Sequence, residues 1–354
     1  MGRALQLAEL GRGHTAPNPL VGAVLVKEGR IVGEGYHAQA GAPHAEVMAL
    51  AAAGTAACGA TLYVSLEPCN HQGRTPPCAP LVRERGVSRV VAATRDPNPI
   101  AQGGLDYLAA QGINVATGLL AEEAQEQNWL FFHGLKHQRP LVLWKAGLSA
   151  DGQISSAPGQ KTQITGLEAQ AVAHGYRQAL GAVAVGIGTV LADDPALTVR
   201  EPDYRAFPWL LWPPAPHDPL KVIFDRQART PLNARVLDGK TLIFCEETAP
   251  RSRRAALQER GAEVVALVEV EPRRALAELW ARGIDGVLLE GGAHLAASFW
   301  EQDLVDALSL FVAPRIFGLG QPALANGLES VRNLVWQEPE LVGSDLWLRG
   351  RVVR

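Results

Sequence analysis

The chain has 354 residues, enough for about two domains that each bury a core of their own. Its 33 basic and 36 acidic residues are balanced and form no polybasic run, so we expect no nucleic-acid partner. Four cysteines do not suggest a disulfide framework, and no apolar run reaches membrane-spanning length, so we expect a cytoplasmic protein with no membrane contact.

Strands and helices alternate in the first part of the chain. The patterns predict an amphipathic helix over residues 1–10, a hairpin of 21–26 and 31–35, helices over 44–53, 79–85, 105–110 and 122–137, and strands over 61–66 and 89–93. A polar stretch then ends at Pro140. We place a domain boundary there, which gives domains of residues 1–138 and 139–354.

The second part repeats the alternation, which predicts a largely parallel sheet covered on both faces. The expected strands are 141–146, 182–186, 221–224, 241–244, 286–289 and 307–312, and the expected helices are 165–180, 251–260, 272–282 and 294–302. Residues 201–219 are rich in proline and lack periodicity, which predicts a surface loop.

Three residues of the first part have the types and order of a catalytic zinc site. His44 precedes a helix, and Cys69 and Cys78 follow the next strand. One imidazole and two thiolates leave the fourth tetrahedral position of the metal open to water. Glu46 lies two residues after His44 and is expected not to ligate, which leaves it available to shuttle protons as the catalytic residue.

The spacing of the cysteines departs from the usual deaminase signature. Eight residues lie between Cys69 and Cys78 where that signature has two. The intervening residues are polar and flexible, and a loop of this kind can line a substrate pocket.

Several blocks of sequence resemble the bifunctional deaminase/reductases of riboflavin biosynthesis, in that family's order and over nearly the whole chain. In the first part they are residues 15–22 (TAPNPLVG), 33–37 (GEGYH) and 68–78 (PCNHQGRTPPC). In the second part they are 145–152 (KAGLSADG), 164–166 (ITG), 186–190 (GIGTV), 193–200 (DDPALTVR) and 289–292 (LEGG).

The resemblance implies an α/β protein with an N-terminal cytidine-deaminase-like three-layer αβα domain and a C-terminal dihydrofolate-reductase-like α/β domain. It implies Zn²⁺ and NADPH as cofactors, a small-molecule pyrimidine ribosyl phosphate as substrate, and a homo-oligomer. The first domain would remove a ring amino group and the second would reduce the ribosyl group to ribityl. The pyrimidine pocket would be lined by Asn18, His37, His71 and Thr75. Without the resemblance, the residues alone favour a turn residue between prolines for Asn18 and a strand-end histidine for His37.

The reductase half lacks a G-x-G-x-x-G motif after a strand, which disfavours a Rossmann fold. Glycines at 186, 188, 291 and 292 instead follow strands, where backbone N–H groups can approach a phosphate. The resemblance makes the cofactor-binding residues Gly147, Gln163, Thr189, Asp193 and Gly292. It makes the reductase-substrate residues Lys145, Lys161, Arg177, Leu197, Arg200 and Glu290, with both arginines on the phosphate. Gln163 stands where the family usually has tryptophan, and Lys161 where it has serine.

Two other interpretations remain open from the residues alone. The zinc domain could deaminate a nucleoside or a tRNA base, although the long cysteine loop and the absence of a basic patch disfavour this. It could also be a structural zinc module on a lone reductase. Glu46 discriminates between these, because a structural zinc has no use for a proton shuttle.

Overall fold

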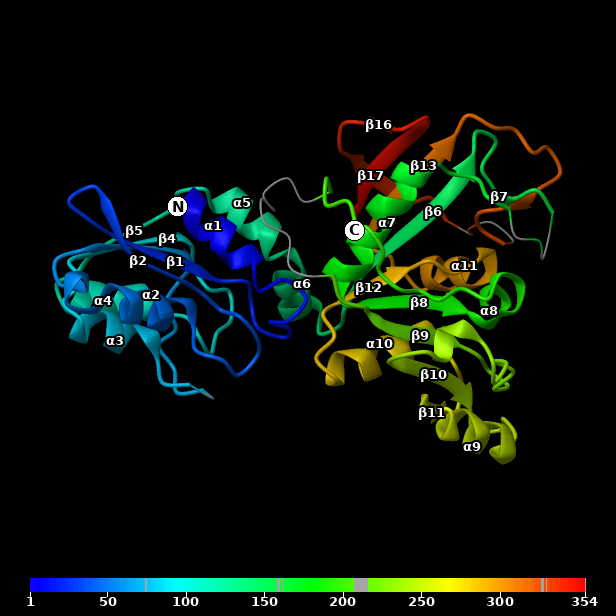
Figure 1. Cartoon of the computed structure of the whole chain (residues 1–354), viewed down its shortest axis with the longest axis horizontal. Coiled ribbons are helices and arrows are strands. Elements are labelled where there is room, and N and C mark those ends of the chain that lie inside the picture. The colour runs from blue at the N-terminus through cyan, green and yellow to red at the C-terminus, as the bar shows by residue number, and fades with distance from the viewer. Residues whose placement is uncertain are drawn as a thin grey trace. The chain divides into compact units, whose positions relative to one another are not determined.

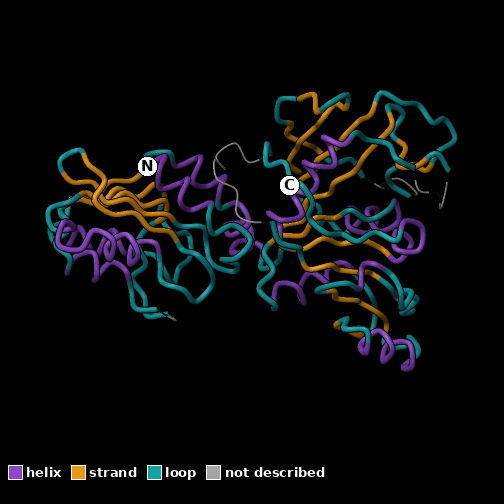
Figure 2. Tube along the Cα trace, in the orientation of Figure 1, coloured by secondary structure: helices purple, strands orange, loops and turns teal. Residues whose placement is uncertain are grey.

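The computed structural model describes residues 1–73, 75–157, 160, 162–206, 216–325, 328 and 330–353. Within these ranges the chain forms two compact units, Met1–Gln138 and a second that begins at Arg139 (Figure 1). Figure 2 shows that each unit combines strands with helices. No helix in the described part of the chain combines the length and apolar character needed to cross a bilayer.

The first unit contains one five-stranded sheet and several helices. In chain order its elements are α1 (Gly2–Glu9), β1 (Gly22–Lys27), β2 (Arg30–Tyr36), α2 (Ala45–Ala53), a 3₁₀ turn (Gly54–Ala57), β3 (Thr61–Leu66), α3 (Cys78–Glu84), β4 (Arg89–Thr94), α4 (Gly104–Ala110), β5 (Asn114–Thr117), α5 (Ala121–Gln127) and α6 (Trp129–His137).

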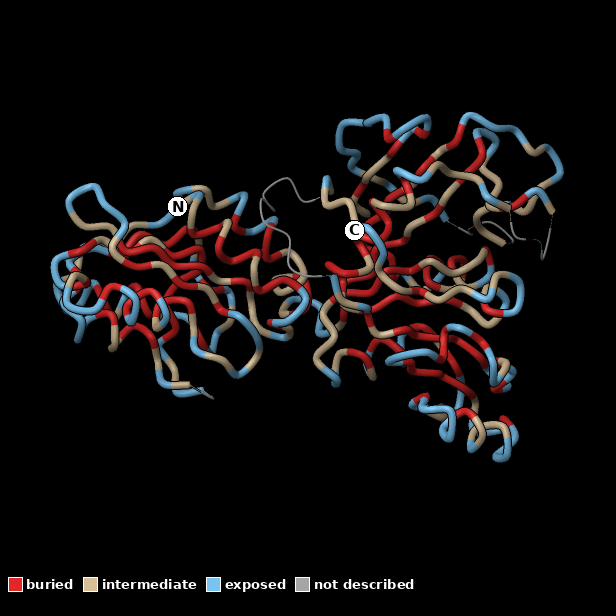
Figure 3. The backbone as a smooth tube through the Cα atoms, in the orientation of Figure 1, coloured by how far each residue is buried: buried red, intermediate tan, exposed pale blue. Residues whose placement is uncertain are grey.

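The sheet of the first unit has the order β2-β1-β3-β4-β5, with the hairpin antiparallel and β3, β4 and β5 parallel. Helices α2, α3 and α4 bury small side chains such as Ala49 and Ala79 against one face of the sheet. Helices α1 and α5 cover the other face (Figures 1 and 3). The expected three-layer αβα arrangement is therefore confirmed.

The second unit is built on a ten-stranded sheet. Its elements are β6 (Leu141–Ser149), β7 (Gln153–Ser155), α7 (Leu167–Leu180), β8 (Ala182–Gly186), α8 (Ile187–Asp193), β9 (Leu220–Phe224), a 3₁₀ turn (Arg235–Leu237), β10 (Thr241–Glu246), α9 (Arg251–Glu259), β11 (Glu263–Leu267), α10 (Pro272–Ala281), β12 (Gly286–Leu289), α11 (Ala293–Glu301), β13 (Ala307–Ala313), β14 (Gln321–Pro322), β15 (Asn333–Trp336), β16 (Glu340–Val342) and β17 (Asp345–Val353).

The strand order is β11-β10-β9-β8-β12-β6-β13-β17-β15, and β16 pairs with β17. Neighbours from β11 to β13 are all parallel, as predicted, whereas β17 runs antiparallel to β13. The main core lies between the sheet and helices α10 and α11, and it includes Trp144 and Ala146 of β6. Because side chains alternate along a strand, Lys145 lies on the opposite face. Helix α7 contacts β8 and β12.

Several elements differ from the sequence predictions. The predicted helix over 122–137 is two helices that meet at Asn128, whose side-chain amide both donates to and accepts from the backbone of Leu20. The glycine-rich segment after β8 continues as α8 (Ile187–Asp193), a helix that the sequence patterns did not predict. Strands β5, β7, β11 and β14–β17 were not predicted, since most are short or only partly buried. Residues 201–206 and 216–219 contain no helix or strand, and the rest of the predicted loop lies outside the described residues.

Candidate active sites

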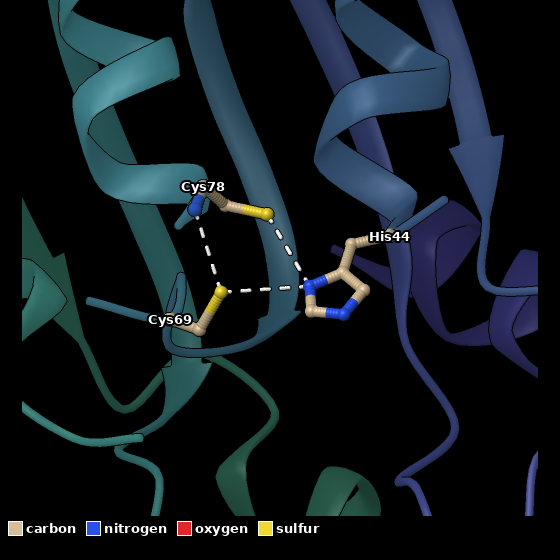
Figure 4. A group of neighbouring side chains, drawn as sticks. All are labelled: His44, Cys69 and Cys78. Carbon is tan, nitrogen blue, oxygen red and sulfur yellow. Dashed lines mark hydrogen bonds between the residues drawn. The ribbon is translucent and has the colours of Figure 1, made fainter. Parts of the chain in front are cut away.

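In the first unit, three predicted metal ligands meet at the edge of the sheet (Figure 4). His44 precedes the first turn of α2, Cys69 lies in the loop after β3, and Cys78 begins α3. Their ligand atoms lie within 4.8 Å of one another. In the part of the chain that the structure describes, this is the only cluster of three or more possible metal-ligating side chains.

The geometry of this cluster fits a tetrahedral metal ion. His44 Nδ1 lies 3.5 Å from Cys69 Sγ and 3.4 Å from Cys78 Sγ. Zinc bonds of roughly 2.0–2.3 Å at tetrahedral angles separate neighbouring ligand atoms by roughly 3.5–3.8 Å. The backbone N–H of Cys78 also donates to Cys69 Sγ over 3.4 Å, a contact that stabilises a thiolate.

The two thiols differ in how readily each loses its proton. The hydrogen bond from Cys78 lowers the pKa of Cys69 to about 4, against the opposing effect of burial. The same bond, together with burial, raises the pKa of Cys78. A thiolate is already favoured at Cys69 beside the imidazole, and binding of a divalent cation favours the thiolate of the second cysteine as well.

Glu46 lies in the first turn of α2 and is buried, with only 3% of its surface exposed. Burial is the main cause that raises its pKa to about 7, and the nearby Cys69 raises it further. Its carboxyl group contacts the Cys78 thiol by a hydrogen bond. The carboxyl group therefore lies beside the ligands, with a pKa suited to gaining and losing a proton at neutral pH.

Hydrogen bonds connect the predicted pyrimidine-pocket residues to this cluster. His37 Nδ1 lies 3.1 Å from the carbonyl oxygen of Pro43, so Nδ1 carries the proton and Nε2 accepts from Asn18 Nδ2 at 3.1 Å. Burial lowers the pKa of His37, which keeps the ring neutral. The rings of His37 and His44 meet edge to face with centroids 5.4 Å apart.

Thr75 lies on the far side of the His44 ring, with Oγ1 3.1 Å from Nε2. Because Nδ1 faces the thiols, Nε2 carries the proton and donates it to Thr75. This hydrogen bond fixes both the tautomer and the orientation of the ring.

His71 belongs to a second group of polar residues beside Cys69. Its Nδ1 is buried and has no hydrogen-bond partner among the described residues. The buried Asp96 lies close enough to His71 and Cys69 to interact with both, and burial raises its pKa to about 6. Glu67 accepts hydrogen bonds from the backbone N–H groups of Asp96, Gly103 and Leu105, which follow β4 in the chain. Asp96 and Glu67 were not predicted, although Glu67 directly follows β3 and Asp96 is the second residue after its parallel neighbour β4.

In the second unit, the predicted residues Lys145, Arg177 and Glu290 converge from β6, α7 and the end of β12. Arg177 donates to both Glu290 carboxylate oxygens at 2.8 Å, from Nε and Nη2. Burial alone would raise the pKa of Glu290, but Arg177 and then Lys145 lower it to about 2. Burial also lowers the pKa of Lys145, against the attraction of Glu290. Glu290 is therefore an anion between two cations.

Arg200 and His174 lie beside this cluster, and the sequence patterns did not single out His174. The backbone N–H of Arg200 donates to Nδ1 of His174 over 2.7 Å. Burial, followed by the nearby Arg177 and Arg200, lowers the pKa of His174 to about 4. The spacing from His174 to Arg177 along α7 could have revealed the histidine, because residues three apart share a helix face.

The predicted cofactor residues Thr189 and Gly292 follow the carboxyl ends of β8 and β12, which are neighbouring parallel strands, and Asp193 is the last residue of α8. Thr189 Oγ1 lies 3.8 Å from where a Cβ at Gly292 would be. A Cβ at Gly291 would lie 2.7 Å from the end of the Leu295 side chain, so a larger residue there would displace that side chain. The backbone at the start of α11 is thus left open to a ligand.

Of the remaining predicted residues, Gly147 and Gln163 both contact Thr165, and Leu197 lies in the segment after α8. Gly147 on β6 faces Thr165, whose Cγ2 would be 3.0 Å from a Cβ, and Gln163 donates to the Thr165 carbonyl oxygen. Leu197 is buried and has a positive φ of 52°. Lys161 lies outside the described residues.

Comparisons with known proteins assign both units. The model of the zinc-binding region of cytidine and deoxycytidylate deaminases matches residues 1–94, and the model of the RibD C-terminal domain matches residues 140–348. The riboflavin biosynthesis protein RibD of Aquifex aeolicus is 40% identical over 97% of this chain and 95% of its own length. The Escherichia coli protein of the same name is 38% identical over 98% and 97%.

Solved structures agree with these matches. Acinetobacter baumannii RibD superposes with a TM-score of 0.87 at 34% identity, covering 99% of this chain and 97% of that one. The Thermotoga maritima diaminohydroxyphosphoribosylaminopyrimidine deaminase/5-amino-6-(5-phosphoribosylamino)uracil reductase gives a TM-score of 0.84 at 34% identity, with coverages of 99% and 97%. The chain therefore belongs to the RibD family of riboflavin-biosynthesis enzymes, in which a zinc-binding deaminase region precedes the C-terminal reductase domain.

Proposed function

We propose that residues 1–138 hydrolytically deaminate 2,5-diamino-6-ribosylamino-4(3H)-pyrimidinone 5′-phosphate and that residues 139–354 then reduce its ribosyl group to ribityl with NADPH. The observation that carries the first step is the buried Glu46 carboxyl group beside three metal-ligating side chains. The activities named for the Thermotoga maritima relative support both steps.

In the deaminase, His44, Cys69 and Cys78 hold Zn²⁺, which supplies an activated water for attack on the pyrimidine ring. Glu46 takes a proton from the nucleophile and delivers it to the departing amino group, so the group leaves as ammonia. A pKa of about 7 suits both transfers. This role argues against a structural zinc module.

Four side chains bind the pyrimidine in this proposal. Asn18 and the neutral His37 form one hydrogen-bonded edge of the pocket. His71, with its buried Nδ1, offers a second polar edge, and Thr75 combines pocket contact with support of His44.

In the reductase, NADPH would supply a hydride to C1′ of the opened sugar, and the adjoining imine nitrogen would need a proton. Lys145 is the proton donor that we assign, because it lies on the α7 face of the sheet near Glu290 and Arg177. Glu290 holds Lys145 and the developing positive charge by its own fixed negative charge. The cofactor contacts are Gly147, Gln163, Thr189, Asp193 and Gly292, with the phosphates at the start of α11.

Arg200 is the principal contact for the substrate phosphate, with Arg177 beside it. Arg177 already donates three hydrogen bonds, two to Glu290 and one to the carbonyl oxygen of Thr198. Among the described residues, two of its five N–H donors have no acceptor and remain for an anion. Leu197 and Lys161 complete the substrate contacts of this proposal.

The cellular setting follows from the substrate. The proposed substrate is a small, doubly charged sugar phosphate that does not cross a membrane unaided, and we propose that the enzyme acts on it in the cytoplasm. Apolar side chains are exposed on β15 and β16, among them Val335 and Leu341. They support a homo-oligomer, because exposed apolar surface favours association. Sedimentation equilibrium would measure the oligomeric state.

The test compares the wild type with Glu46→Gln. The variant is expected to keep its zinc, release no ammonia from the diaminopyrimidinone, and reduce the already deaminated substrate at the wild-type rate. Metal content, ammonia release and product mass with and without NADPH are measured. Loss of zinc, or deamination near the wild-type rate, would sink the role of Glu46.

A further inference from the structure

The segment 198–204 forms neither helix nor strand, yet side chains of α7 hold its start at two points. Arg177 Nη1 donates to the carbonyl oxygen of Thr198 over 2.9 Å. His174 Nδ1 accepts the backbone N–H of Arg200 over 2.7 Å. Helix α7 therefore holds the backbone on both sides of Val199, the residue before Arg200.

The same face of α7 holds the rest of the segment. Residues on this face are three or four positions apart, and they are Ala171, His174, Gly175 and Gln178. The backbone N–H of Asp203 donates to the Ala171 carbonyl oxygen, and a Cβ at Gly175 would lie 2.3 Å from the Asp203 carbonyl oxygen. Tyr204 donates its hydroxyl to Gln178 over 2.5 Å. The segment therefore lies directly on the helix.

The backbone of this region is strained, so it needs such support. Asp194, Leu197 and Glu201 have positive φ angles of 40°, 52° and 42°, a conformation that side-chain-bearing residues rarely adopt. Strain of this kind persists only when surrounding contacts hold it. Asp218 adds one such contact by accepting the backbone N–H of Val199 over 2.8 Å.

His174 is suited to accept the N–H of Arg200. It is buried, and its pKa of about 4 leaves Nδ1 unprotonated at neutral pH. The charged groups around it are Arg177 on its own helix, Arg200, Glu290 and Lys145. The His174 ring is therefore neutral, although charged groups of the reductase site surround it.

We propose that His174 is a positioning residue of the reductase, whose hydrogen bond from the Arg200 backbone sets the guanidinium group against the substrate phosphate. The inference rests on the proposed role of Arg200. It assigns to His174 no contact with substrate or cofactor.

The first test replaces the acceptor. His174→Leu is expected to raise the reductase KM for the deaminated pyrimidine ribosyl 5′-phosphate about tenfold with kcat unchanged, and to raise it little for the phosphate-free substrate. His174→Asn, whose amide oxygen takes the place of Nδ1, is expected to restore the wild-type KM. Tyr204→Phe is the matched control: it removes a bond from the same helix face beyond Arg200, and its KM is expected to stay unchanged.

Thermal unfolding accompanies each variant. If His174→Leu does not fold, His174→Gln replaces it, with an acceptor displaced by one bond and the same expected rise in KM. A folded His174→Leu or His174→Gln variant that keeps the wild-type KM overturns the proposal, as does an equal rise in Tyr204→Phe.

A double-mutant cycle separates this inference from the proposed function. If His174 acts through Arg200, adding His174→Leu to Arg200→Ala should raise KM no further than Arg200→Ala alone. Additive effects would show that His174 acts independently and overturn the inference. An Arg200→Ala variant with unchanged KM would instead refute the phosphate role of Arg200 itself, on which the inference depends.

Discussion

The two sites of this enzyme manage their buried polar groups in opposite ways. In the deaminase, two thiols and one imidazole nitrogen point at a common centre, where their lone pairs suit a cation. In the reductase, Arg177 and Glu290 form a buried ion pair, and Lys145 lies near the same carboxylate. The first arrangement depends on a bound ion for its stability, whereas the second is satisfied within the protein.

Their protonation behaviour differs accordingly. The Glu46 pKa of about 7 allows the carboxyl group to change its charge during a reaction at neutral pH. Glu290, with a pKa of about 2, stays ionised throughout that range. The difference follows from their surroundings: burial opposes ionisation of Glu46, whereas Arg177 keeps Glu290 ionised despite its burial.

The largest expected effect comes from removing a metal ligand. Cys69→Ala leaves two protein ligands, so metal affinity should fall by more than the roughly 10–100-fold that the loss of a supporting residue costs. Ammonia release should be abolished, while NADPH oxidation with the deaminated substrate should continue. Metal analysis and the two activity assays check this. Cys58→Ala is the control, because Cys58 is exposed and outside the cluster; equal zinc loss there would contradict the assigned ligand set.

The charge cluster should respond through stability as well as activity. Glu290→Gln leaves the buried Arg177 without its carboxylate, and the free energy of unfolding of the reductase unit should fall by about 3–5 kcal/mol. Glu278→Gln removes the partner of Arg282 in a more exposed pair and should cost less than about 1 kcal/mol. Denaturant titration measures both. Similar losses of unfolding free energy in the two variants would show that the buried pair stabilises the fold no more than the exposed pair does.

The same cluster sets a direction for the pH dependence. Glu290 has a folded-state pKa near 2, below its ordinary 4.5, so its stabilising contribution is complete above about pH 4.5 and is lost as pH falls toward 2. Glu290→Gln should remove this part of the acid sensitivity. A reductase transition with unchanged acid sensitivity in the variant would contradict the assignment.

The metal site was predictable because its residues carry their chemistry in their types and lie in one stretch of the chain. Cys69 and Cys78 have few alternative roles in a chain with four cysteines, and His44 starts a predicted helix. The parallel part of the second sheet was predictable for a similar reason, because its strands are continuous apolar runs.

The spacing to Arg177 places His174 on the same helix face, but the role of His174 could not be predicted in this way. Its role depends on a hydrogen bond to the backbone of Arg200, 26 positions away, in a segment without periodicity. The break at Asn128 has the same origin, since the side chain bonds to Leu20 across 108 positions. Side-chain-to-backbone contacts over long separations leave no local signal in sequence.

The smallest effect, and the finest test of the contrast, concerns Thr75. Thr75→Val removes the hydroxyl that receives the proton of His44 Nε2 but keeps the shape of the side chain. The ring would lose the contact that fixes its tautomer with Nδ1 facing the thiols, and zinc affinity should fall about 10–100-fold. Thr75→Ser keeps the hydroxyl and should bind zinc nearly as the wild type does. Competition with a chromogenic chelator measures the three affinities. If Val and Ser weaken zinc equally, the contact at 75 is one of packing, and the imidazole is held in place by its edge-to-face contact with His37 instead.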